Sequence, residues 1–135
     1  MYNNILVPIS FDAERDMTGS LKLARLLASP EAKITLLHVM EHIPAYASSY
    51  LPGDYINEAR EAIKTELEEL AATVPGAHGV VIEGHSGRSI LDWADTNKPD
   101  LIIIASHRPG MQDLLLGSTA SQVVRHAACA VHVVR

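Results

Sequence analysis

The chain is poor in cysteine, in aromatic residues and in basic charge, and each shortage excludes a class of protein. The single cysteine, Cys129, cannot form an intramolecular disulfide, which suits a reducing compartment. Aromatic residues make up only 4% of the chain, so we expect an aliphatic core. The formal net charge of −5 argues against the broad basic face that nucleic-acid binding requires. No nucleic-acid partner is therefore expected.

Long apolar runs are also missing. No run approaches the ~18 residues of a membrane-spanning helix, and residues 1–4 do not resemble a signal peptide. We therefore expect no membrane partner and a cytoplasmic location. With 47% apolar and 20% charged residues, the composition is that of an ordinary globular protein. The length of 135 residues predicts one domain, covering residues 1–135.

Short apolar runs alternate with helical patterns along the chain. The runs are β-rich and do not alternate strongly between apolar and polar residues, which is typical of strands buried on both faces. They lie at residues 5–9, 34–39, 101–105 and 131–134, with a weaker run at 79–83. Helical spacing occupies residues 17–28, 54–73, 89–95 and 118–127. This order predicts an α/β fold: a single-domain, doubly wound, open parallel sheet of five strands with helices on both faces.

One connection, residues 40–53, is much longer than the others. Loops of this length often form lids or interaction surfaces. Pro44, Pro52 and Gly53 predict that the loop contains no helix.

A Gly-Ser-Thr sequence opens the last predicted helix, after a buried strand and a polar loop. The free N–H groups and dipole of a helix N-terminus, together with two hydroxyl groups, can all face a phosphate. In doubly wound sheets, ligands bind outside the carboxyl ends of the strands. The sequence therefore predicts an anion or nucleotide site at the carboxyl edge of the sheet. Its candidate residues from strand ends and helix start are Pro8, Ile9, Ser10, Val39, Ala105, Ser106, Gly117, Ser118 and Thr119.

Structural explanations compete with this interpretation. Gly117-Ser118 is also explained as a simple helix cap, because serine is a preferred capping residue. The seven histidines do not show the spacing of a zinc site, so no metal ligands are predicted. Histidines 38 and 132 are expected to pack within strands, and Cys129 to be a packed thiol.

Nearly the whole chain resembles the universal stress protein family. The resemblance rests on residues 5–9 (ILVPI), on residues 36–39 (LLHV) and above all on residues 105–135 (ASHRPGMQDLLLGSTASQVVRHAACAVHVVR). Nucleotide-binding members have a Gly-x2-Gly-x9-Gly-Ser/Thr loop after the fourth strand. Gly117-Ser118 matches its end, whereas Ala105 replaces the first glycine and the second is missing. The shortened loop is similar to that of the F/G branch of the family.

The resemblance implies a Rossmann-like fold of the adenine nucleotide alpha hydrolase type that binds ATP, with AMP or ADP as alternatives. It implies that Val39 contacts adenine and that Pro8 and Ile9 line the pocket. Where the family usually has an aspartate near the ribose or base, this chain has Ser10, and Asp12 is a nearby substitute. Bound Mg²⁺ or Mn²⁺ is left open. The residues implied to surround the ribose and phosphates are Ala105, Ser106, His107, Arg108, Gly117, Ser118 and Thr119.

The implied function is that of a regulatory, stress-response module with little or no catalytic turnover. The chain has no Walker A lysine motif and no evident general base beside the phosphate loop. A slow ATPase, an autophosphorylating protein and a dimeric scaffold that binds no nucleotide are the alternatives. A phospho-receiver would need an acidic cluster after the first strand, where the chain has Pro8-Ile9-Ser10. The family resemblance also implies a homodimer through the C-terminal strand, residues 130–134, with a tetramer as a larger alternative.

Overall fold

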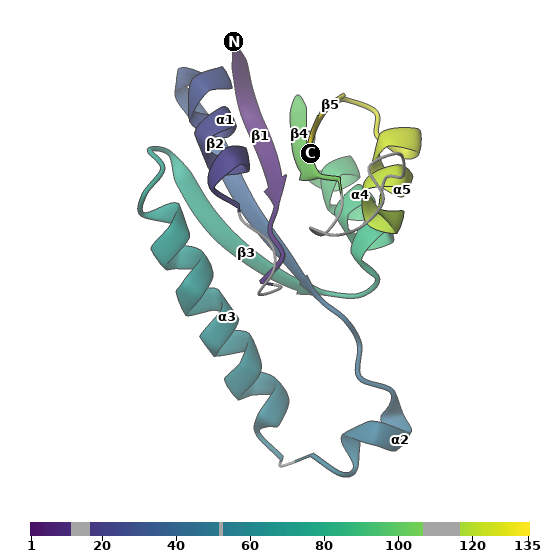
Figure 1. Ribbon diagram of the computed structural model, residues 1–135. Helices are drawn as coiled ribbons and strands as arrows, with labels where there is room; N and C mark the ends of the chain where they lie inside the picture. The colour runs from purple at the N-terminus through teal and green to yellow at the C-terminus, as the bar shows by residue number, and fades with distance from the viewer. Residues whose placement is uncertain (12–16, 52, 107–116) are drawn as a thin grey trace.

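Five parallel strands form one sheet in the order β3-β2-β1-β4-β5, with helices on both faces (Figure 1). The computed structural model describes residues 1–11, 17–51, 53–106 and 117–135. The strands are β1 (Tyr2–Pro8), β2 (Ala28–Met40), β3 (Ala77–Glu83), β4 (Leu101–Ala105) and β5 (Ala130–Val134). The helices are α1 (Thr18–Leu27), α2 (Ala45–Ser48), α3 (Tyr55–Ala71), α4 (Ser86–Asn97) and α5 (Ser118–His126). The predicted fold class is confirmed.

Each face of the sheet has its own aliphatic core. Side chains of successive strand residues point to opposite faces, so β1 serves both cores. Ile5 and Val7 pack with α1 and α3, whereas Leu6 packs with α4 and α5. Cys129 packs against the second core, and its burial raises the pKa of its thiol. The expected aliphatic core and packed thiol are both confirmed.

Helices α4 and α2 differ most from the sequence prediction. Helix α4 begins at Ser86 rather than at Ser89, so Gly87 lies in its first turn. A Cβ atom at Gly87 would collide with the side chain of Gln122 on α5, so glycine here serves the contact between the two helices. The prediction that residues 40–53 contain no helix is wrong, because α2 follows Pro44 directly. A proline just before a helix is tolerated, since the first N–H groups of a helix have no intrahelical acceptor.

The ladder between β1 and β4 ends earlier than the ladder between β1 and β2. β1 pairs with β4 at Ile5 and Leu6, but it pairs with β2 as far as Pro8. The Ile9 N–H donates to the Leu37 carbonyl on β2, at 2.8 Å. Because strand residues alternate in direction, the backbone of Pro8 faces β4, and proline has no N–H to donate. β1 and β4 therefore stop pairing near their carboxyl ends.

Asp100 holds the start of β1 next to β4. Its carboxylate accepts hydrogen bonds from the N–H groups of Asn3, at 2.9 Å, and Asn4, at 3.0 Å. In return, the Asp100 N–H donates to the Asn4 carbonyl at 2.8 Å. The carboxylate thus accepts hydrogen bonds from two backbone donors at the start of β1.

We expect Asp100→Ala to lower the free energy of unfolding by about 1–3 kcal/mol, because two N–H groups lose a charged acceptor. Urea titration of the native protein and the variant measures the loss. The control is Asp95→Ala, which removes an exposed carboxylate from α4 and should change stability by less than about 0.5 kcal/mol. Equal losses in the two variants would show that the Asp100 hydrogen bonds contribute nothing specific.

Candidate functional site

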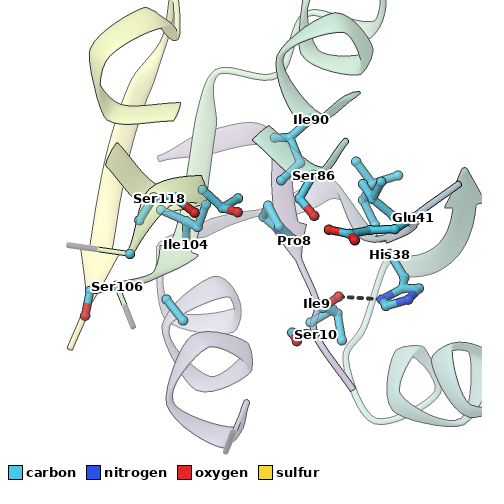
Figure 2. Close-up of a pocket in the computed structure, with 16 residues that line it drawn as sticks. Pro8, Ile9, Ser10, His38, Glu41, Ser86, Ile90, Ile104, Ser106 and Ser118 are labelled. Carbon is cyan, nitrogen blue, oxygen red and sulfur yellow. Dashed lines mark hydrogen bonds between the residues drawn. The ribbon is translucent and has the colours of Figure 1, made fainter. Parts of the chain in front are cut away.

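A cavity of about 430 Å³ opens at the carboxyl ends of β1, β2 and β4 (Figure 2). It lies where β1 and β4 have stopped pairing, and the first turns of α4 and α5 complete its walls. This is the place where the winding of the sheet reverses, since β1 is the strand from which the order proceeds in both directions. Ligands of doubly wound folds bind at such a position.

Every predicted site residue that the structure describes lines this one cavity. They are Pro8, Ile9, Ser10, Val39, Ala105, Ser106, Gly117, Ser118 and Thr119. Two further predicted residues, His107 and Arg108, lie outside the described residues, and so does Asp12. The topology thus gathers residues from the two ends of the chain at one edge of the sheet.

Backbone hydrogen bonds hold the start of α5 against the end of β4. The Ser106 N–H donates to the Val134 carbonyl of β5 at 2.8 Å, and the Gly117 N–H donates to the Ser106 carbonyl. Ser106 itself is almost completely buried. The strand end and the helix start are therefore joined directly, although ten positions separate them in the sequence.

The N-terminus of α5 presents hydrogen-bond donors to the cavity. Gly117 is the N-cap residue, and as a glycine it has no side chain with which to cap the helix. The first helical bond of α5 runs from the Ser121 N–H to the Gly117 carbonyl, at 2.9 Å. The N–H groups of Ser118, Thr119 and Ala120 precede that bond and have no acceptor within the helix. Ser118 is the first residue of the helix and Gly117 is its cap. The Ser118 hydroxyl is therefore not explained by a role as the helix cap.

Several residues of the cavity wall were not predicted from the sequence. His38 and Glu41 come from β2 and the residue after it, and Ser86 and Ile90 come from the start of α4. The position of Ser86 just after the strand at residues 77–83 is a signal for it, since strand ends of the same sheet meet at the cavity. No local pattern marks Glu41. Leu37, Ile104 and Ala120 complete the wall.

His38 combines a structural hydrogen bond with a place in the cavity wall. Its Nδ1 lies 2.8 Å from the Ile9 carbonyl oxygen (Figure 2), and its ring lies 5.2 Å from that of Phe11 between centroids. A carbonyl oxygen only accepts, so Nδ1 carries the proton. The expectation that His38 is packed and hydrogen-bonded is confirmed, whereas His132, which was expected to pack in the same way, is exposed on β5.

The chemical character of the cavity differs between its two sides. The α5 side offers backbone N–H groups and the hydroxyls of Ser118 and Thr119, which favour an anion. Ile9 and Val39 provide apolar surface between the strand ends.

In the part of the chain that the structure describes, no group of three or more potential ligand residues could hold a metal ion. None of the described helices is long and apolar enough to cross a membrane.

Comparison with known proteins relates this chain to one family along its whole length. A family model described as "Universal stress protein family" matches residues 1–135. Universal stress protein A homolog 2 of Coxiella burnetii is 34% identical over 140 residues, which covers 99% of this chain and 95% of that protein.

Solved structures share the fold. Universal stress protein UspA from Lactobacillus plantarum superimposes with a TM-score of 0.71 at 28% identity, covering 99% of this chain and 98% of that one. A family protein from Arabidopsis thaliana, solved with AMP bound, superimposes with a TM-score of 0.63. At 18% identity, covering 98% of this chain and 90% of the other, this second likeness concerns the fold alone.

Proposed function

The chain belongs to the universal stress protein family, and from this premise we propose that its cavity binds an adenine nucleotide, ATP or AMP, with the phosphates at α5. The observation that carries the proposal is the N-terminus of α5, which starts at a glycine and whose first N–H groups border the cavity beside two hydroxyls. A cavity of about 430 Å³ matches the size of common small-molecule sites. The AMP bound to the Arabidopsis thaliana protein supports the choice of ligand.

We further propose that binding regulates a stress response and that turnover is slow or absent. Glu41 and His38 are the only acid–base side chains among the described residues of the cavity wall, and Nδ1 of His38 already donates to Ile9. No lysine or arginine is among the described wall residues. Phosphoryl transfer relies on positioned cations and a group that orients the nucleophile, and the described wall offers few of them.

The proposed phosphate site is tested by Ser118→Asp. A carboxylate at the first helical position is favourable for the helix dipole, so the variant should fold as well as the native protein. The same negative charge occupies the proposed phosphate site and should lower the affinity for ATP and AMP at least ~10-fold, as measured by calorimetry. Little or no phosphate should be released from ATP in the same solutions.

The matched control is Ser121→Asp, which makes the same substitution on α5 at a serine outside the cavity wall. It should leave both affinities nearly unchanged. If the native protein and Ser118→Asp bind ATP and AMP with equal affinity, the phosphates do not bind at the N-terminus of α5. If the native protein binds no adenine nucleotide at all, the proposed function is wrong.

We also propose a homodimer in which β5 of one copy pairs antiparallel with β5 of another. β5 is the last strand of the sheet, with β4 on its other side. An edge strand presents unpaired N–H and carbonyl groups, and pairing of two identical edges about a two-fold axis uses up both. The family resemblance of the C-terminal strand supports this arrangement.

A further inference from the structure

One carboxylate faces the cavity, on the side away from the proposed phosphate site. Glu41 follows the end of β2. It is exposed, but Figure 2 shows its carboxylate directed toward the other labelled residues of the cavity wall. It is the only acidic side chain among the described residues of the wall. The described part of the chain offers its carboxylate no ion pair, since the acidic groups in salt bridges there are Glu83 and Asp92.

A carboxylate in an anion-binding cavity makes the two sides electrically different. The α5 side carries the partial positive charge of a helix N-terminus, and the Glu41 side carries a full negative charge. A phosphate near Glu41 would be repelled, whereas a phosphate at α5 would not. A ligand that bears an anion at one end is therefore accepted in one orientation.

The end of the ligand that faces Glu41 must supply hydrogen-bond donors. An ionised carboxylate only accepts hydrogen bonds, and it has two oxygens for this purpose. A nucleoside carries two kinds of suitable donor, the ribose hydroxyls and the exocyclic amine of adenine. A ligand without donors at this end would cover the carboxylate without compensating its lost hydration.

We propose that Glu41 accepts hydrogen bonds from the nucleoside half of the ligand and thereby determines both its orientation and its selectivity. The inference rests on the proposed nucleotide site and adds a residue to it. Glu41 contributes recognition from β2, across the cavity from the phosphate-binding helix. Adjacent to it on the wall, Val39 provides the apolar surface of the same strand end.

The test compares native protein, Glu41→Gln and the control Glu31→Gln by calorimetry. Glu31 is an exposed residue near the other end of β2 and does not line the cavity. We expect Glu41→Gln to weaken AMP binding at least ~5-fold, because a charged acceptor is replaced by an amide. Binding of inorganic triphosphate should stay the same or become tighter, because a negative charge is removed from the wall. Glu31→Gln should change neither affinity.

Two ligand analogues identify the donor. If the ribose hydroxyls face Glu41, the variant should lose affinity for IMP as it does for AMP, and the loss should shrink for 2′-deoxy-AMP. If the adenine amine faces Glu41, the loss should persist for 2′-deoxy-AMP and disappear for IMP. Either pattern supports the proposal. Glu41→Asp, which withdraws the charge by one methylene group, repeats the test in a second variant should Glu41→Gln fold poorly, and it should also lose AMP affinity.

AMP binding of native strength in Glu41→Gln and Glu41→Asp would overturn this inference and leave the nucleotide site standing. The absence of AMP and ATP binding in the native protein would overturn the proposed function and this inference together.

Discussion

A Val133→Pro variant is expected to sediment as a folded monomer at concentrations where the native protein sediments as a dimer. The direction of the backbone explains the choice of residue. The Val134 carbonyl accepts the Ser106 N–H from the β4 side, so the backbone groups of Val134 and His132 face β4. Those of Val131 and Val133 therefore face the open edge. Proline at position 133 removes an outward donor and leaves the β4–β5 ladder intact.

His132→Pro is the matched control for this experiment. The same substitution one residue earlier removes a donor that faces β4, where His132 is in register with Ile103. It should lower the free energy of unfolding of the chain itself by about 1–3 kcal/mol, because a ladder hydrogen bond is lost and its acceptor is left unpaired. The two variants thus separate the dimer from the fold. A native protein that sediments as a monomer at all concentrations, or a dimeric Val133→Pro, would contradict pairing through β5.

Leu67→Ala is expected to lower the free energy of unfolding by about 2–5 kcal/mol, the range for a large aliphatic side chain deleted from a core. Leu67 is fully buried, with 0% of its surface exposed, where α3 covers the sheet. Thermal or urea unfolding measures the loss. The control is Leu26→Ala, because Leu26 on α1 is 78% exposed and its truncation should cost less than about 0.5 kcal/mol.

Gly79 shows why the cost of Leu67→Ala should be large. A Cβ atom at Gly79 would lie 2.9 Å from Cγ of Leu67, so the leucine occupies the space that β3 leaves open by having no side chain there. Gly79→Ala alone should therefore destabilise the protein, because the leucine must shift. In the Leu67→Ala background the same change should destabilise less or even stabilise, since the added methyl group enters the vacated space. Additive effects of the two changes would contradict this packing.

The strands could be predicted because the pattern that defines each of them lies within a few consecutive residues. Residues 101–105 form a continuous apolar run, and only a strand buried on both faces needs such a run. The start of α4 was not predictable in the same way. By its own propensity, Gly87 favours a turn. Glycine is needed at this position of α4 because the side chain of Gln122, on α5, packs where a Cβ atom would lie.

Some residues of the candidate site could be predicted from the sequence and others could not. Residues at strand ends and at the α5 start were identified because the topology rule states where such ends meet. Glu41 was missed because it stands one residue beyond β2, in a connection whose direction no periodic pattern defines. Ser86 was missed because the helix was predicted to start only at residue 89. Glu41 and Ser86 line the cavity because of the path that the backbone takes, and no sequence motif marks either residue.

The central position of β1 affects how the protein can fold while it is being synthesised. β1 is synthesised before the other strands of the sheet, but Asp100, whose carboxylate accepts from the N–H groups of Asn3 and Asn4, follows 96 residues after Asn4. Until then β1 can pair with β2 alone and has an open apolar edge on its β4 side. Nascent chains are therefore most exposed to wrong strand pairing while residues 28–100 are being made. A translational pause before β4 should raise aggregation more than a pause after β5.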